Sequence, residues 1–305
     1  MPSVQANGIT IEYDERGSGD PLLMIMGLGA QLIHWPEGFI DQLAARGFRV
    51  IRFDNRDAGL STEFHWDPPS MTKSLVSSLR KKNPGNGYTL SDMSDDAFGL
   101  MDALGIQSAH LVGASMGGMI AQTMAIEHPE RVRSLTSIMS HTGDRKNGNI
   151  SMTVLPAFMR HKPVKETAAE TGTDLYAKFV GSSWDRQTHL ERSRRAVERS
   201  FRPQGGARQI AAIAASPDRT PDLRRLDVPT LVIHGLQDKL VKPSGGYATV
   251  KAIPGAQLLV FPDMGHDLPM NRWEEMITAI RQLADRAQDG GSGNDDLAMA
   301  DGSQQ

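Results

Sequence analysis

The sequence predicts an α/β protein with a mostly parallel central sheet, helices on both faces and an inserted helical cap. Short apolar runs typical of buried strands alternate with longer stretches whose apolar residues recur at helical spacing. This alternation stops between residues 140 and 225, where several helical stretches occur without a strand pattern. Because parallel neighbours need crossover connections, the alternating helices are expected to connect the strands and cover the sheet.

Five strands are predicted in the first part of the chain, at residues 9–13, 21–26, 49–53, 109–112 and 132–139. The first alternates apolar and polar side chains, whereas 21–26 is apolar throughout, as in a strand buried on both faces. Helical spacing predicts helices between these strands at 35–45, 90–104 and 116–128.

The strand pattern resumes after residue 225, with strands at 229–235 and 258–261 and a last helix at about 269–287. We therefore divide the chain into a core in two parts, 1–139 and 226–287, with the cap at 140–225 between them. Residues 288–305 are rich in Gly, Asp, Ser and Gln. Such a segment buries too little apolar surface to offset its ordering entropy, so we expect a disordered tail.

The composition is that of a globular protein, with 39% hydrophobic and 23% charged residues among 305. A net charge of -3 lacks the excess of Lys and Arg that phosphate neutralisation requires, so we expect no nucleic-acid partner. The absence of cysteine excludes disulfides, thiolate metal sites and a cysteine nucleophile. With neither a secretory-signal pattern nor a long apolar stretch, we expect a cytoplasmic protein without a membrane partner; the oligomeric state stays open.

Ser115 lies in the sequence Gly113-Ala-Ser-Met-Gly117, which fits G-x-S-x-G. The pattern alone also describes a glycine-rich turn with a bystander serine. Its position between an apolar strand and a helix favours a strained turn that projects the serine oxygen from the sheet edge. The N-terminus of the following helix directs free N–H groups toward developing negative charge.

A serine hydroxyl needs a base, commonly an imidazole oriented by an acid. Asp238 and His266 each follow a predicted strand directly, in the order serine, acid, histidine. They are our candidates, with Asp263 and Asp144 as rival acids. The alternative for His266 is a surface histidine, and the rival bases near the same sheet edge are His34, His141 and His234.

A tetrahedral intermediate carries an oxyanion that needs two fixed donors. One is expected from the residue after the nucleophile, Met116, and one from the loop after the early strand, where we assign the N–H of Leu28. Gly29 is the alternative if the loop turns differently, and a simple turn without this role is the other interpretation.

These residues together resemble the α/β-hydrolase fold family over residues 9–287. The segment 54–61 is similar to the family's D-x-R-G-x-G-x-S loop, with Asp57 where glycine is usual, and Met26-Gly27 replaces a common His-Gly. Four segments are similar to carboxylesterases of the aclacinomycin methylesterase type: Met26-Gly-Leu-Gly29, Trp35-Pro36, Gly113-Ala-Ser-Met-Gly-Gly118 and Asp218-Arg-Thr-Pro221.

The resemblance implies hydrolysis of a small-molecule ester through an acyl-enzyme, with no metal or organic cofactor. Ser115 argues against dehalogenases and epoxide hydrolases of this fold, which carry aspartate there. Lactonase, thioesterase, carbon–carbon bond hydrolase and cofactor-free haloperoxidase or perhydrolase activities remain open on the same residues, as does a non-catalytic ligand-binding protein.

The cap differs from the rest of the chain in charge, because 140–225 contains 16 basic and 9 acidic residues. Our favoured interpretation is a solvated helical surface, with six charged residues facing water: Glu191, Arg192, Arg194, Arg195, Glu198 and Arg199. The alternative is that some arginines attract an anionic substrate. Five aromatic residues either line a pocket or form the core of the cap: Phe158, Tyr176, Phe179, Trp184 and Phe201.

Overall fold

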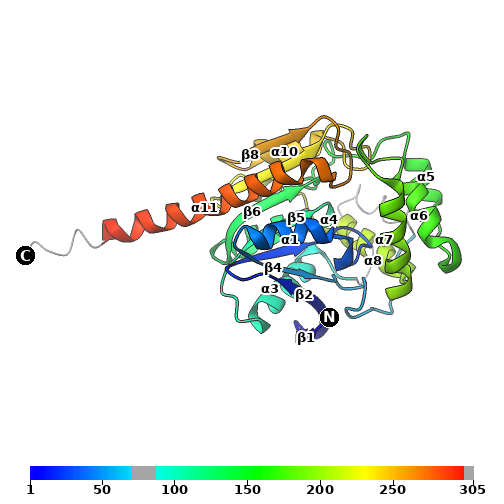
Figure 1. The fold of residues 1–305 in the computed structure, drawn as a ribbon, viewed down its shortest axis with the longest axis horizontal. Helices are drawn as coiled ribbons and strands as arrows, with labels where there is room; N and C mark the ends of the chain where they lie inside the picture. Colours follow the sequence, from blue (N-terminus) through cyan, green and yellow to red (C-terminus); the bar gives the residue numbers. More distant parts are fainter. Residues whose placement is uncertain (71–86, 299–305) are drawn as a thin grey trace, which may run out of the picture.

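The structure is a computed structural model and describes residues 1–70 and 87–298. Its described strands form one sheet in the order β1-β2-β4-β3-β5-β6-β7-β8 (Figure 1). The pairs β1–β2 and β2–β4 are antiparallel, and the other neighbours are parallel. The strands are β1 (Ser3–Ala6), β2 (Ile9–Arg16), β3 (Asp20–Ile25), β4 (Phe48–Phe53), β5 (Ala109–Ala114), β6 (Val132–Ile138), β7 (Thr230–Gly235) and β8 (Gln257–Phe261).

Helices cover both faces of this sheet, each over its own apolar cluster. On one face pack α1 (Glu37–Ala45) and α11 (Trp273–Ala298), which contribute Phe39, Leu43 and Ile280. On the other face pack α3 (Leu90–Ala103), α4 (Met116–Glu127) and α10 (Ser244–Ala252). The predicted α/β fold is therefore confirmed.

Between β6 and β7 the chain forms helices and no strand. These helices are α5 (Leu155–Arg160), α6 (Ala168–Tyr176), α7 (Arg186–Arg199), α8 (Pro203–Ala215) and α9 (Thr220–Leu223). Figure 1 shows α5, α6, α7 and α8 gathered at one end of the sheet. Single 3-10 turns complete the described elements: η1 (Leu32–His34), η2 (Pro129–Arg131), η3 (Lys165–Thr167) and η4 (Met270–Arg272).

Two boundaries differ from the sequence prediction. The edge strand β1 was not predicted, because it is only four residues long and Ala6 is its one buried residue. The last helix was predicted to end near residue 287, with a disordered tail from 288, but α11 continues to Ala298. Extending an existing helix needs no new nucleation, which a prediction from composition ignores. The rest of the expected tail, 299–305, lies outside the described residues.

No described helix is long and apolar enough to span a membrane.

Candidate active site

Ser115 lies in the sharp turn between β5 and α4, as its sequence pattern predicts. Its backbone has φ 56° and ψ −118°, a strained combination for a residue with a side chain. The turn is tight because α4 begins directly against the end of β3. A Cβ atom at Gly117 would lie 1.9 Å from the carbonyl oxygen of Ile25, so only glycine fits there.

The structure brings Ser115, His266 and Asp238 into one chain of contacts. Ser115 Oγ lies 3.0 Å from His266 Nε2, and His266 Nδ1 lies 2.7 Å from Asp238 Oδ2. Both distances are within hydrogen-bond range. His266 is 5% exposed and Asp238 3%, so bulk water is largely kept from this contact chain.

Asp238 is held rigidly behind the histidine. Its Oδ1 accepts hydrogen bonds from the backbone N–H groups of Leu240 and Val241, both at 2.9 Å, which leaves Oδ2 directed at His266. The rival acids have other partners. Asp263 forms an ion pair with Arg272 at 3.0 Å, and Asp144 accepts a backbone N–H from Lys146.

The rival histidines also have other partners. His34 Nδ1 accepts the backbone N–H of Gln31, and His141 Nδ1 accepts that of Gly143. His234 is buried, and its Nε2 lies 2.8 Å from the carbonyl oxygen of Val241 and 3.6 Å from Asp238. His234 therefore adjoins the aspartate without reaching the serine contact made by His266.

The loop after β3 passes directly beside the serine. A Cβ atom at Gly27 would lie 3.1 Å from Ser115 Cβ, a tight contact that favours glycine. The N–H of Gly29 donates to Gln209 Oε1 at 2.7 Å, whereas the N–H groups of Leu28 and Met116 donate to no other described residue. Met116 is the first residue of α4, where helices leave N–H groups free. These observations favour Leu28 over Gly29 as the second expected donor.

A cavity of about 320 Å³ opens above these groups. The core contributes Gly27, Leu28, Ser115 and His266 to its lining, and the helical segment contributes most of the opposite wall. Of the five aromatic residues singled out in that segment, four line the cavity: Phe158, Tyr176, Phe179 and Trp184. Phe201 is not among its lining residues. A serine hydroxyl, an imidazole and two N–H groups without a partner among the described residues thus lie beside a largely apolar cavity, and groups of this kind are what acyl transfer requires.

Residues 20–272 match the family model described as the alpha/beta hydrolase fold. The chain belongs to the α/β-hydrolase fold family. The match spans both parts of the core and the segment between them, and it agrees with the sheet order and the serine turn described above.

Some relatives are named as esterases or hydrolases, and others as putative non-heme bromoperoxidases. Rhodomycin D methylesterase DauP of Streptomyces sp. (strain C5) is 27% identical over 92% of this chain and 97% of its own length. A 2-hydroxymuconate semialdehyde hydrolase of Pseudomonas putida is 29% identical over 86% of each chain. A thermophilic esterase from Thermogutta terrifontis has a TM-score of 0.73 at 25% identity, covering 94% of this chain and 99% of its own. The predicted resemblance to methylesterases is thereby confirmed.

The one departure in the hydrolase-fold loop 54–61 has a structural explanation. Asp57, where glycine is usual, adopts φ 67°, a left-handed conformation that Asp tolerates better than most residues. Its buried carboxylate accepts hydrogen bonds from Tyr88 Oη at 2.7 Å, Phe64 N at 2.8 Å and Arg208 Nη1 at 3.0 Å. These hydrogen bonds stabilise Asp57 in a left-handed backbone conformation that glycine adopts without such support.

The charged face of α7 differs in part from the expected solvated surface. Arg194 is exposed and pairs with Glu170 at 2.8 Å, as that interpretation predicts. The expectation is wrong for Arg199, which is 14% exposed and pairs with Asp54 at 2.7 Å. It is also wrong for Arg192, which lines the cavity and donates to the carbonyl oxygen of His34 at 3.2 Å. Among the described residues, no carboxylate lies within ion-pair distance of Arg192.

Three supporting residues were not found from the sequence. Asn55 donates to the carbonyl oxygen of Met26 at 2.9 Å, and Gln209 accepts from Gly29. Asp267, beside His266, accepts the N–H groups of Gly181 and Gly265, and burial raises the pKa of its carboxyl. One signal was available for Gln209, since it shares the inward face of α8 with Gly205 and Ala212, where an apolar residue is the norm.

Two half-buried histidines of the cavity wall are held neutral. Burial lowers the pKa of His34 to about 4, assisted by the charge of Arg192. Burial lowers the pKa of His189 to about 3, and its ring stacks on Tyr176 at 4.2 Å. Both values lie below the ordinary 6.5. As the pH falls below 6.5, these two histidines bind protons in the unfolded chain but stay unprotonated in the folded protein until the pH approaches their lowered pKa values.

We therefore expect the folded state to lose stability as the pH is lowered from about 6.5 toward about 4. His189→Phe keeps an aromatic ring beside Tyr176 but removes one titrating group, so its melting temperature should fall less steeply over this range. The measurement is thermal unfolding of both proteins at a series of pH values. His128→Gln, at an exposed position, is the control. Parallel pH curves for wild type and His189→Phe would contradict the assignment.

Proposed function

We propose that this protein is a serine hydrolase that cleaves a carboxylic ester of a small molecule through an acyl-enzyme. The observation that carries the proposal is the contact chain from Ser115 through His266 to Asp238, with distances of 3.0 and 2.7 Å, at the base of the cavity. The methylesterase and hydrolase relatives support the same reaction class.

In the first half-reaction, His266 Nε2 takes the hydroxyl proton as Ser115 Oγ bonds to the ester carbonyl carbon. The carbonyl electron pair moves to oxygen, and the resulting oxyanion accepts hydrogen bonds from the N–H groups of Leu28 and Met116. Asp238 stabilises the imidazolium. When the intermediate collapses, the ester C–O bond breaks and His266 returns the proton to the departing alcohol. Water then attacks the acyl-enzyme by the same steps and releases the acid and free Ser115.

A fluorophosphonate probe tests serine activation without knowledge of the natural substrate. The expected result is covalent labelling of Ser115, located by mass spectrometry of the digested protein, with hydrolysis of a short p-nitrophenyl ester lost in parallel. An unlabelled Ser115 and no turnover of any ester would instead favour the non-catalytic ligand-binding alternative. A panel of matched esters, lactones and thioesters separates the reaction types that the same residues support.

Arg192 favours substrates that carry a carboxylate away from the scissile bond. Arg192 lines the cavity, its guanidinium has no carboxylate partner among the described residues, and burial lowers its pKa. A partly buried cation gains most from a ligand anion that replaces the missing partner. Of the arginines in 140–225 that were expected to attract an anionic substrate, Arg192 is therefore the one we propose for this role.

We expect Arg192→Met to raise KM for a carboxylate-bearing ester about tenfold, the size of one lost charged hydrogen bond, and to leave a neutral ester of equal length unaffected. Steady-state kinetics with both esters provides the measurement. Arg194→Met is the matched control, because Arg194 lies on the same helix but is exposed and paired with Glu170. Equal effects of Arg192→Met on both esters would eliminate this role.

A further inference from the structure

Two helices of the inserted segment contact the loop that carries Leu28. The first contact comes from α8, through Gln209, whose side chain is fully buried. Its Oε1 accepts the N–H of Gly29 at 2.7 Å, and its Nε2 donates to the carbonyl oxygen of Arg56 at 2.8 Å. Gln209 therefore links the loop after β3 to the segment after β4.

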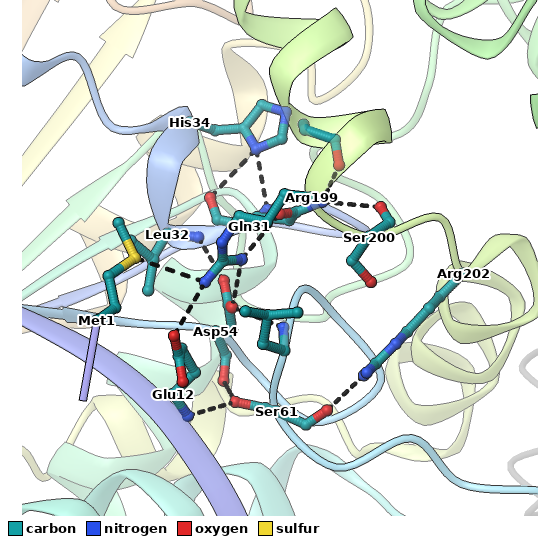
Figure 2. Close-up of polar contacts among 12 residues, drawn as sticks. Met1, Glu12, Gln31, Leu32, His34, Asp54, Ser61, Arg199, Ser200 and Arg202 are labelled. Atoms are coloured by element: carbon teal, nitrogen blue, oxygen red, sulfur yellow. Dashed lines mark hydrogen bonds and ion pairs between the residues drawn. The ribbon is translucent and has the colours of Figure 1, made fainter. Parts of the chain in front are cut away.

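The second contact comes from the end of α7 and involves Arg199. Figure 2 shows its guanidinium between Gln31 and Asp54, 2.8 Å from Gln31 Oε1 and 2.7 Å from Asp54 Oδ2. Gln31 in turn donates to the carbonyl oxygens of Ala196 and Ser200, at 2.7 and 3.0 Å. The far end of the loop is thereby fastened to α7.

The core holds the same loop at two further points. Asn55 donates to the carbonyl oxygen of Met26 at 2.9 Å, and Asp54 Oδ1 accepts the N–H of Leu32 at 2.7 Å. The core contacts thus fix residues 26 and 32, at the two ends of the loop. Among the described residues, only Gln209 forms a side-chain hydrogen bond to Gly29.

The contact at Gly29 bears directly on the orientation of Leu28. A peptide unit is planar, so fixing the N–H of Gly29 also fixes the carbonyl of Leu28 and restricts rotation about the Leu28 backbone. Gly29 itself has φ 66° and no side chain that could brace it. The peptide that presents the Leu28 N–H is also held by the turn hydrogen bond from the N–H of Ala30 to the carbonyl oxygen of Gly27, at 3.2 Å, so Gln209 adds a second restraint to this turn.

We propose that Gln209 is a positioning residue that orients the oxyanion donor Leu28, so that the inserted segment completes the catalytic centre as well as covering it. This inference rests on the proposed function. Oxyanion stabilisation depends on donors fixed in advance near the developing charge, and small misplacements are costly. The effect of Gln209 should therefore appear in the chemical step more than in substrate binding.

Gln209→Met tests the proposal, because methionine has a similar length and lacks both amide contacts. We expect kcat for a short p-nitrophenyl ester to fall about 10- to 100-fold, with KM changed less than about twofold. A trifluoromethyl ketone, whose adduct with Ser115 carries an oxyanion, should lose affinity by the same factor as kcat. If Gln209→Met does not fold, Gln209→Asn retains a polar amide but shortens it by one methylene, and the same three measurements apply.

Arg208→Met is the matched control. Arg208 is the preceding residue of α8, is also buried, and binds Asp57 at 3.0 Å and the carbonyl oxygen of Trp66 at 2.7 Å, away from the loop. It should keep kcat and ketone affinity even if its melting temperature falls. An equal loss of kcat in Arg208→Met, or unchanged kcat and ketone affinity in a folded Gln209 variant, would overturn the proposal. An active Ser115→Ala would instead refute the proposed function itself.

Discussion

Ser115→Ala is expected to reduce kcat for a p-nitrophenyl ester about 10⁶-fold, the loss seen when a hydrolase nucleophile is removed. Alanine fits the turn between β5 and α4, because the substitution only removes the Oγ that lies 3.0 Å from His266 Nε2. The variant should therefore fold normally and still bind substrate. Initial-rate assays at high enzyme concentration measure the residual turnover of Ser115→Ala, and thermal unfolding tests whether the variant is folded.

Ser183→Ala provides the comparison for this loss. Ser183 also lines the cavity, but its hydroxyl contacts Asp263 and does not reach His266. It should retain wild-type kcat within about twofold, as expected for a surface substitution. Turnover by Ser115→Ala at the wild-type rate would show that another group is the nucleophile.

Asp238→Asn is expected to lower kcat about 10⁴-fold while leaving KM nearly unchanged. Asparagine can still accept the N–H groups of Leu240 and Val241 through Oδ1, so the loop keeps its shape. Its Nδ2 then faces His266 Nδ1 as a donor. This contact favours the tautomer with hydrogen on Nε2, which can no longer accept the Ser115 proton.

The rival acid provides the control for this variant. Asp263 lies 21% exposed in an ion pair with Arg272, and Asp263→Asn should leave kcat near the wild-type value. Kinetics of both variants on one ester separates the two assignments. A loss in Asp263→Asn that exceeds the loss in Asp238→Asn would transfer the orienting role to Asp263.

The sequence was sufficient for those features that depend on local pattern. Strand and helix periodicity predicted the α/β sheet, and the positions of Ser115, Asp238 and His266 after predicted strands placed all three at one edge. In a parallel sheet, the carboxyl ends of neighbouring strands lie together, so order along the chain becomes proximity in space. The structure brings these three side chains into contact.

Features that depend on long-range packing were not predictable in this way. Gln209 lies 180 residues from Gly29, and nothing in the sequence pairs them. The water-facing assignment failed for Arg192 and Arg199 because helical spacing shows which residues share a face, but not which element covers that face. The helix beyond residue 287 was missed because its composition alone favours disorder.

The shared construction of the cavity has a consequence for how specificity diverges within such enzymes. Substitutions at Phe158, Trp184 or Arg192 alter the wall without touching the strands that carry the reacting groups. Exchange of the whole segment 140–225 for that of a relative is more disruptive, because the resulting chimera also loses Gln209. Such a chimera is expected to acquire the donor's substrate preference and lose turnover unless an equivalent amide is grafted with it. New specificities are then expected to arise from point changes at wall positions such as Phe158, Trp184 and Arg192, with Gln209 retained.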